Sequence, residues 1–288
     1  MLRRMKIFLQ IRARIQSLLF SVAALALVAA TFGASAATAE HLHTVQNTEQ
    51  LTPMQREIER QRRRLRSEDI EERRDALMRL NNLKRPDAAR VAVAGLSDSA
   101  PIVRVTAAHA IMSLPQAESA ALLLPLLQDK LEFVRREAAY ALGETRSRSA
   151  VAPLANILTS DKEMTVRSAA AVALGEIGDE SAVQALAQAL AGPPGKKKKD
   201  KGEANDFVKR AAARSLGRIK SRAGVEVLIA TLSNDVNDSD VRREAATALG
   251  LIGDMTAVPA LQAAFASSDP YLSEAARAAL RRLKVTKN

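Results

Sequence analysis

The sequence of 288 residues has no cysteine, no tryptophan and only three histidines. Without cysteine the chain forms no disulfide, has no thiol nucleophile and cannot be a lipoprotein, because the lipid would need a cysteine. The histidines are His41, His43 and His109, and none is followed by glutamate. Two histidines close together in a chain terminus make a poor metal site. We therefore predict no metal, no cofactor and a fold that depends on packing alone.

Patterns for catalysis and for base stacking are also missing. No serine is framed by glycines, no histidine is placed to activate one, and no glycine-rich loop could hold a phosphate. We predict that the protein is not an enzyme and has no catalytic residues. Single-stranded nucleic acid stacks on aromatic side chains, of which the chain has few. Beyond residue 40 they are Phe133, Tyr140, Phe207, Phe265 and Tyr271.

The formal net charge of +11 is concentrated in two segments. The first 39 residues contain five basic residues and no acidic one. Residues 191–205 contain five lysines against Asp200 and Glu203. The rest of the chain is nearly balanced, so the charge does not indicate a nucleic-acid partner.

One pattern recurs along the chain with a nearly fixed period. A valine followed by a basic residue returns every 31 to 33 residues, with one longer step of 42. The copies are Val103-Arg104, Val134-Arg135, Val166-Arg167, Val208-Lys209 and Val241-Arg242, with a decayed first copy at Arg73 and a decayed last copy at Leu272-Ser273. Such a period predicts stacked units that share one continuous core.

Each repeat is predicted to be a pair of helices. Val134, Ala138, Ala141 and Leu142 are spaced as one face of a helix. A glycine after this pattern is expected to end the first helix in left-handed geometry, at Gly143, Gly175, Gly217 and Gly250. Asp179 or Ser181, and Asp254 or Thr256, are expected to cap the second helix, and Pro153 and Pro259 fit its first turn.

The repeat Val-Arg-x-x-Ala-Ala-x-Ala-Leu-Gly-x-Ile-Gly-Asp resembles HEAT repeats, in particular the short subtype named after phycobilisome lyases. The resemblance covers roughly residues 67–283. It implies an all-α, right-handed α-solenoid of six to seven helix pairs over residues 67–284. The subtype is shared by lyases, a hydroxylase and adaptors, so the fold alone does not assign an activity. The family's hydroxylase holds iron with His-Glu pairs, which this chain lacks.

The first 39 residues differ in kind from the repeats. Basic residues precede an apolar run from Ser17 to Gly33, which leads into the small residues Ala34 to Ala39. This order predicts a secretory signal peptide and an exported, periplasmic or secreted protein of a bacterial cell envelope. The alternative is an uncleaved anchor in the inner membrane, since residues 18–39 are long enough to span a bilayer.

Residues 40–66 are predicted to form a linker and a capping helix. Thr52-Pro53 opens the helix, and Ser67 is expected to cap the one that follows. A polar cap on the solenoid is the favoured interpretation, and a short coiled-coil contact is the alternative. At the other end, Ala275, Ala276, Ala279, Leu280 and Leu283 are spaced as the apolar face of a closing helix.

The basic residue that follows the repeated valine recurs once per repeat, so stacking would align these residues into a basic column, which we predict to be structural. An aspartate lies six or seven residues before most of its arginines, and HEAT-like families use this pairing as an inter-repeat ladder. An arginine that meets a carboxylate is already satisfied, so anion binding is the less favoured alternative. The predicted ladder residues are Asp98, Arg104, Asp129, Arg135, Asp161, Arg167, Asp235 and Arg242.

Two surfaces are predicted to bind partners. The second helices carry mostly neutral polar residues, which suit a peptide or helix lying in a groove: Asn156, Gln184, Gln188, Glu226 and Gln262. The insertion at 191–205 is either a dispensable loop or a basic finger for an anionic surface, through Lys196, Lys197, Lys198, Lys199 and Lys201.

The function we predict is a non-enzymatic scaffold or adaptor of the cell envelope that binds a protein partner through the solenoid groove. A phycobilin-lyase-like or hydroxylase-like oxidoreductase enzyme of the same repeat family is the alternative. It needs a bound cofactor, and an exported chain is in the wrong compartment for bilin chemistry. A membrane tether that uses the lysine-rich loop is a lesser alternative.

Overall fold

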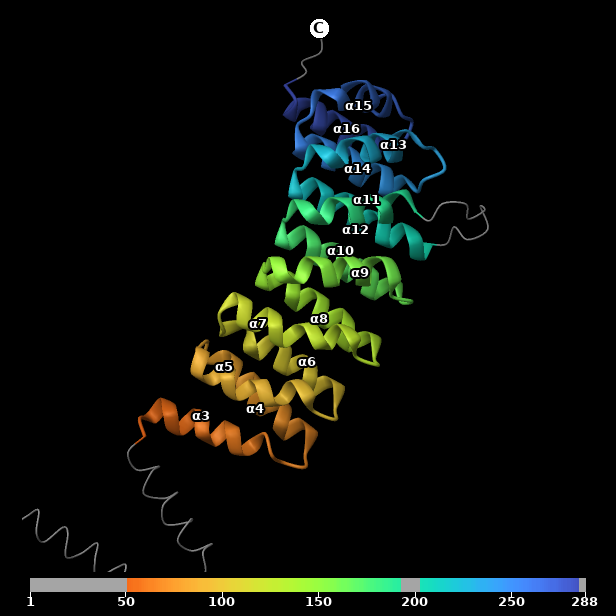
Figure 1. The fold of residues 1–288 in the computed structure, drawn as a ribbon. Coiled ribbons are helices and arrows are strands. Elements are labelled where there is room, and N and C mark those ends of the chain that lie inside the picture. Colours follow the sequence, from red (N-terminus) through yellow and green to blue (C-terminus); the bar gives the residue numbers. More distant parts are fainter. Residues whose placement is uncertain (1–50, 193–202, 285–288) are drawn as a thin grey trace, which may run out of the picture. The chain divides into compact units, whose positions relative to one another are not determined.

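A computed structural model describes residues 51–192 and 203–284, and within these ranges the regular secondary structure is entirely helical (Figure 1). The chain divides into a unit that ends at Glu59 and a unit that starts at Arg60. The predicted signal peptide, the two N-terminal histidines and the five lysines of the insertion lie outside the described residues.

Helix α3 (Pro53–Arg64) begins where the sequence predicts. The backbone N–H of Thr52 donates to the side-chain oxygen of Gln55 at 2.9 Å, and the backbone N–H of Gln55 donates to Oγ1 of Thr52 at 3.2 Å. This reciprocal cap satisfies two backbone donors at the helix start. In its last turn, Arg64 pairs with Glu72 and Asp75 at 3.2 and 2.6 Å.

The second unit is a stack of helix pairs. Its first helices are α4 (Ile70–Asn82), α6 (Pro101–Ala110), α8 (Glu132–Thr145), α10 (Met164–Ile177), α12 (Glu203–Ile219) and α14 (Ser239–Ile252). Its second helices are α5 (Pro86–Ala92), α7 (Gln116–Leu123), α9 (Val151–Ser160), α11 (Val183–Ala191), α13 (Val225–Ser233) and α15 (Val258–Phe265). The described residues therefore form six pairs, and α16 (Pro270–Arg282) packs on α14 after the last of them.

Each first helix contacts the first helix of the next pair, from α4 through to α16. Short 3₁₀ segments complete the second helices, including η1 (Val93–Ser97) after α5 and η3 (Leu124–Gln128) after α7. The apolar face predicted for α8 is buried, and so are Ala276, Ala279 and Leu280 of α16. The predicted all-α solenoid is confirmed.

The glycines after the Ala-Leu step do not end their helices, so that prediction is wrong. Gly143, Gly175, Gly217 and Gly250 lie inside α8, α10, α12 and α14, and the glycines with positive φ among the described residues are Gly178, Gly192 and Gly253. A Cβ atom added to Gly217 would lie 2.8 Å from the Cα atom of Ala248 on the next first helix. These internal glycines are contact points between helices, where a side chain would meet the neighbouring backbone.

The helix caps follow the sequence with one exception. The carboxylates of Asp179 and Asp254 accept backbone N–H groups two residues on, as predicted. Ser67 does not cap α4. The cap is Asp69, whose carboxylate accepts the N–H of Glu71 at 2.9 Å, while Oγ of Ser67 accepts the N–H of Asp69 at 3.2 Å. The serine therefore shapes the turn before the cap.

Candidate functional site

Three arginines of the basic column each bind the aspartate that ends the second helix of the same pair, where the sequence of the next repeat begins, and we call these pairs the arginine ladder. In each pair, Nε and Nη2 of the guanidinium donate to the two carboxylate oxygens. The Nε and Nη2 distances are 2.7 and 2.8 Å in the first pair along the chain, 2.8 and 3.0 Å in the second, and 2.7 and 3.0 Å in the third. Two-pronged contacts of this kind are among the stronger ion pairs in proteins. The pairs are Arg73–Asp98, Arg104–Asp129 and Arg135–Asp161.

The aspartate six residues before each arginine has a different role from the one that the spacing suggests. Nη1 of Arg135 donates to the backbone oxygen of Asp129 at 2.9 Å, while the carboxylate it meets is that of Asp161, 26 residues later. Each arginine thus holds the turn before its own helix and the end of the next second-helix segment. Arg73, which in sequence looks like a decayed copy, is a full member of the ladder.

The ladder carboxylates are partly shielded from solvent and have lowered pKa values. The hydrogen bond from Arg73 is the largest influence on Asp98 and lowers its pKa. At Asp161, burial raises the pKa, but hydrogen bonds from Arg135 and from the backbone N–H of Glu163, together with nearby positive charge, outweigh it. The side chains of Arg135 and Asp161 are only 10% and 6% exposed. The ion pair is therefore the stable charge state at neutral pH.

The ladder does not continue through the second half of the stack. Among the residues that the structure describes, no carboxylate pairs with Arg167, and Lys209 donates to the side-chain oxygen of Asn237 at 3.0 Å. Arg242 contacts Asp235 at 3.1 Å, but this pair lies within one repeat, and Asp235 is 88% exposed. The predicted Asp235–Arg242 pair is therefore not an inter-repeat contact.

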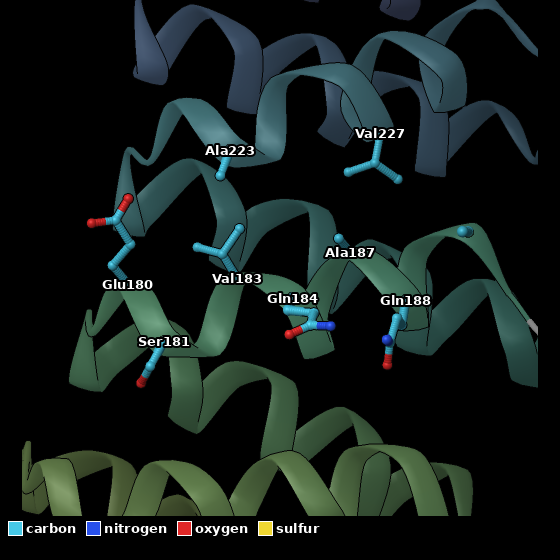
Figure 2. Close-up of a pocket in the computed structure, with 9 residues that line it drawn as sticks. Glu180, Ser181, Val183, Gln184, Ala187, Gln188, Ala223 and Val227 are labelled. Atoms are coloured by element: carbon cyan, nitrogen blue, oxygen red, sulfur yellow. The ribbon is translucent and has the colours of Figure 1, made fainter.

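The predicted groove residues all lie on second helices and are all exposed. Two of them, Gln184 and Gln188 of α11, line an open depression of about 620 Å³ between α11 and α13. Figure 2 shows their side chains beside the smaller apolar Val183 and Ala187, with Val227 on the adjoining helix. The other three predicted residues belong to α9, α13 and α15 and do not line this depression: Asn156, Glu226 and Gln262.

The repeat chemistry has a match among known families. HEAT repeats match residues 61–139, 123–199 and 201–281, which together span most of the chain. The chain belongs to the HEAT-repeat family. No curated protein matches the sequence.

Several solved structures are similar to this HEAT-repeat chain. The complex of CpcE and CpcF of phycocyanin lyase from Nostoc is 24% identical over 81% of this chain and 87% of that one, with a TM-score of 0.46. Human deoxyhypusine hydroxylase is 20% identical over 80% and 97%, with a TM-score of 0.40. A designed armadillo repeat protein is 19% identical over 78% and 98%, with a TM-score of 0.40.

His109 is the one histidine within the described HEAT repeats, and it lies on α6 with its Nε2 3.9 Å from an oxygen of Glu137. No group of three or more metal-binding side chains was found among the described residues. No helix within the described residues is long and apolar enough to cross a membrane.

The apolar part of the depression was not predicted. Val183, Ala187 and Val227 belong to the apolar stripes of their helices, so the sequence places them in the core. Val183 is buried, whereas Ala187 and Val227 are partly exposed.

Proposed function

We propose that this HEAT-repeat protein is a non-enzymatic scaffold or adaptor that binds a protein partner along the exposed face of its second helices. Residues 1–39 further support a location in the bacterial cell envelope, either exported or held at the inner membrane. The proposal rests on how charge is distributed between the two layers of helices.

The two layers differ sharply in charge. Helices α9, α11 and α15 contain no charged residue, α7 and α13 contain one glutamate each, and α5 contains Asp87 and Arg90. The first helix α8 alone contains Glu132, Arg135, Arg136, Glu137 and Glu144. Charged residues are depleted at the centres of protein interfaces and common on surfaces that face only water. From α7 to α15 the second-helix layer is therefore poor in charge and has the composition of a binding face.

The first-helix layer instead uses its charges internally. Arg210 pairs with Asp240 of the next first helix at 2.9 Å, and Arg214 pairs likewise with Glu244. Arg218 pairs with Glu176 on the preceding first helix. These contacts tie neighbouring repeats together, so this face has less reason to attract a charged partner.

The depression between α11 and α13 gives the second-helix face a place for a side chain to enter. Its apolar lining offers burial, and the amides of Gln184 and Gln188 can each donate and accept hydrogen bonds at its rim. A peptide or amphipathic helix that lies across second helices uses this combination.

The test is site-specific photo-crosslinking in the native cells. A photoreactive amino acid replaces Gln188 on the second-helix face, and a matched variant carries it at Thr247, an exposed neutral residue of the first helix α14. We expect one crosslinked protein from position 188 and none from position 247. Crosslinking of the same protein from both positions, or from position 247 alone, would exclude the second-helix face as the binding surface.

A second measurement separates the adaptor from an enzyme. Purified protein is examined for bound metal by mass spectrometry and for a chromophore by its absorbance spectrum. We expect neither at a stoichiometric level. A stoichiometric metal or bilin would refute the proposal and favour the enzyme of the same repeat family.

A further inference from the structure

The arginine ladder follows a rule that can be stated from three examples. The residue that ends each of the first three second-helix segments is an aspartate in extended backbone, with ψ values of 147°, 142° and 136°. Its carboxylate receives Nε and Nη2 of the arginine in the preceding first helix. The aspartates are Asp98, Asp129 and Asp161.

The fourth pair keeps the arginine and lacks the aspartate. Nη1 of Arg167 donates to the backbone oxygens of Asp161 and Lys162 at 2.8 and 3.0 Å, as Nη1 does in the ladder arginines. The guanidinium is therefore held in the ladder position. The residue that ends α11 is Gly192, which has no side chain to offer and whose φ of 79° differs from the negative φ of the ladder aspartates. Among the side chains of residues 51–192 and 205–284, no carboxylate contacts Nε or Nη2 of Arg167.

Two side chains of α12, those of Lys209 and Asn205, lie near Gly192. A Cβ atom built on Gly192 would lie 3.9 Å from Cε of Lys209 and 4.0 Å from Nδ2 of Asn205. Arg167 and Lys209 carry positive charge, and Asn205 contributes two N–H donors. A carboxylate near Gly192 would lie close to these two side chains of α12, and by analogy with Arg135 and Asp161 it would also be within reach of Arg167 of α10.

We propose that Arg167, Asn205 and Lys209 form a binding site for a carboxylate from an acidic segment of the protein partner. We call it the Gly192 site. This inference rests on the proposed adaptor function and names the chemistry of the partner. A glutamate or aspartate side chain would replace the ladder aspartate and restore the two-pronged contact with Arg167.

Three observations favour a partner as the source of the carboxylate. Ala191, which lines the depression, directly precedes Gly192, so a peptide in the depression ends beside the site. Residues 191–205 hold five lysines against two acidic residues, a balance that attracts an acidic segment. Glu203 already begins α12, whereas the ladder aspartates have extended backbone.

The test uses the full chain and a fluorescein-labelled hexaglutamate peptide, with hexaglutamine as the matched neutral probe. Fluorescence anisotropy measures the dissociation constant. We expect hexaglutamate alone to bind, and Arg167→Gln to weaken it about tenfold or more, because a two-pronged charged contact is lost. Arg167→Lys, which keeps the charge, should recover only part of the loss. Arg148→Gln removes an 88% exposed arginine and should bind as wild type.

The lysines of the insertion attract the peptide as well, so the comparison is repeated with Lys196, Lys197, Lys198 and Lys199 replaced by glutamine. The Arg167→Gln effect should persist in this background. Circular dichroism verifies that each variant is folded. Equal binding by wild type and Arg167→Gln in both backgrounds would overturn the inference.

A carboxylate of the chain itself would also overturn it. If Asp200 or Glu203 occupies the site, Asp200→Asn with Glu203→Gln should lower the melting temperature when Arg167 is present and leave it unchanged in the Arg167→Gln background. We expect no such coupling. The crosslinking from Gln188 is scored separately, so the adaptor proposal can fail or stand independently of this site.

Discussion

Replacing Arg135 with glutamine should remove the most shielded pair of the arginine ladder. The mutation abolishes two hydrogen bonds to Asp161, at 2.7 and 3.0 Å, and the contact with the backbone oxygen of Asp129 at 2.9 Å. The Asp161 side chain is 6% exposed, so its charge would stay in place with little water to solvate it. Breaking a buried ion pair from one side costs about 3–5 kcal/mol. Because both groups keep some exposure, we expect a loss of about 3 kcal/mol.

The assay is urea unfolding followed by circular dichroism, with extrapolation to zero denaturant. For a domain of this size, about 3 kcal/mol corresponds to a fall in melting temperature of roughly 6–12 °C. The matched control is Arg148→Gln in the same repeat, where the arginine pairs with Asp179 at 2.9 Å but is 88% exposed. An exposed pair of this kind contributes less than about 1 kcal/mol.

A double-mutant cycle isolates the contact itself. Asp161→Asn keeps an oxygen that can accept the backbone N–H of Glu163, which the carboxylate accepts at 2.9 Å, and removes the charge. The free energies of unfolding of Arg135→Gln, Asp161→Asn and the double variant should show a coupling of about 1.5 kcal/mol or more. If Arg135→Gln and Arg148→Gln have the same free energy of unfolding, the structural role of the ladder is refuted. If Arg135→Gln weakens partner binding and leaves stability unchanged, anion binding is favoured instead.

Three further predictions follow from the same contacts. The pKa of Asp98 is lowered mainly by its hydrogen bond with Arg73, so the ionised Asp98 stabilises the fold fully above its unfolded pKa of about 4, and this stabilisation is lost as the pH falls through the lower folded value. The free energy of unfolding, measured between pH 5 and 2, should show this loss. Asp98→Asn should make the free energy of unfolding less dependent on pH in that range. Gly217→Ala should destabilise the stack by about 1–3 kcal/mol in the same urea assay, because the new Cβ would lie 2.8 Å from a neighbouring Cα atom; an unchanged midpoint would show that the helices can separate at no cost. Asp69→Ala should cost about 1 kcal/mol by removing the cap of α4, and no loss of stability would show that water replaces it.

The repeat period and the helix faces could be predicted because both are written locally in the sequence. The spacing of Val134, Ala138 and Leu142 defines a buried face without reference to any other repeat. The pairing between repeats could not be predicted in the same way. The constant six-residue spacing reflects the contact of Arg135 with the backbone oxygen of Asp129, whereas the carboxylate that it binds comes from the following repeat. A short spacing is visible in the sequence, but the identity of the spatial partner depends on how the repeats stack.

The internal glycines show a second limit of sequence analysis. Gly217 follows an apolar helical pattern, which is also where a helix commonly ends. Its actual role depends on the 2.8 Å approach of a backbone atom from another helix, and no local pattern encodes that distance. The depression has the same difficulty: Gln184 and Gln188 are predicted from their polarity, while Ala187 and Val227 belong to stripes that the sequence assigns to the core.

The end of the ladder and the insertion are best understood as one change in the stack. In the first three pairs, the arginine holds the backbone of one turn through Nη1 and the end of the next second-helix segment through Nε and Nη2. A turn held at both ends cannot easily lengthen, because residues added after the aspartate would separate its backbone oxygen from the arginine of the next first helix. At the end of α11 a glycine, Gly192, stands where the earlier pairs have the aspartate, so this position offers no carboxylate to Arg167. Lengthening a surface connection costs little once such contacts are lost. The loss of the aspartate and the longer repeat spacing therefore fall at the same point of the stack, directly after α11.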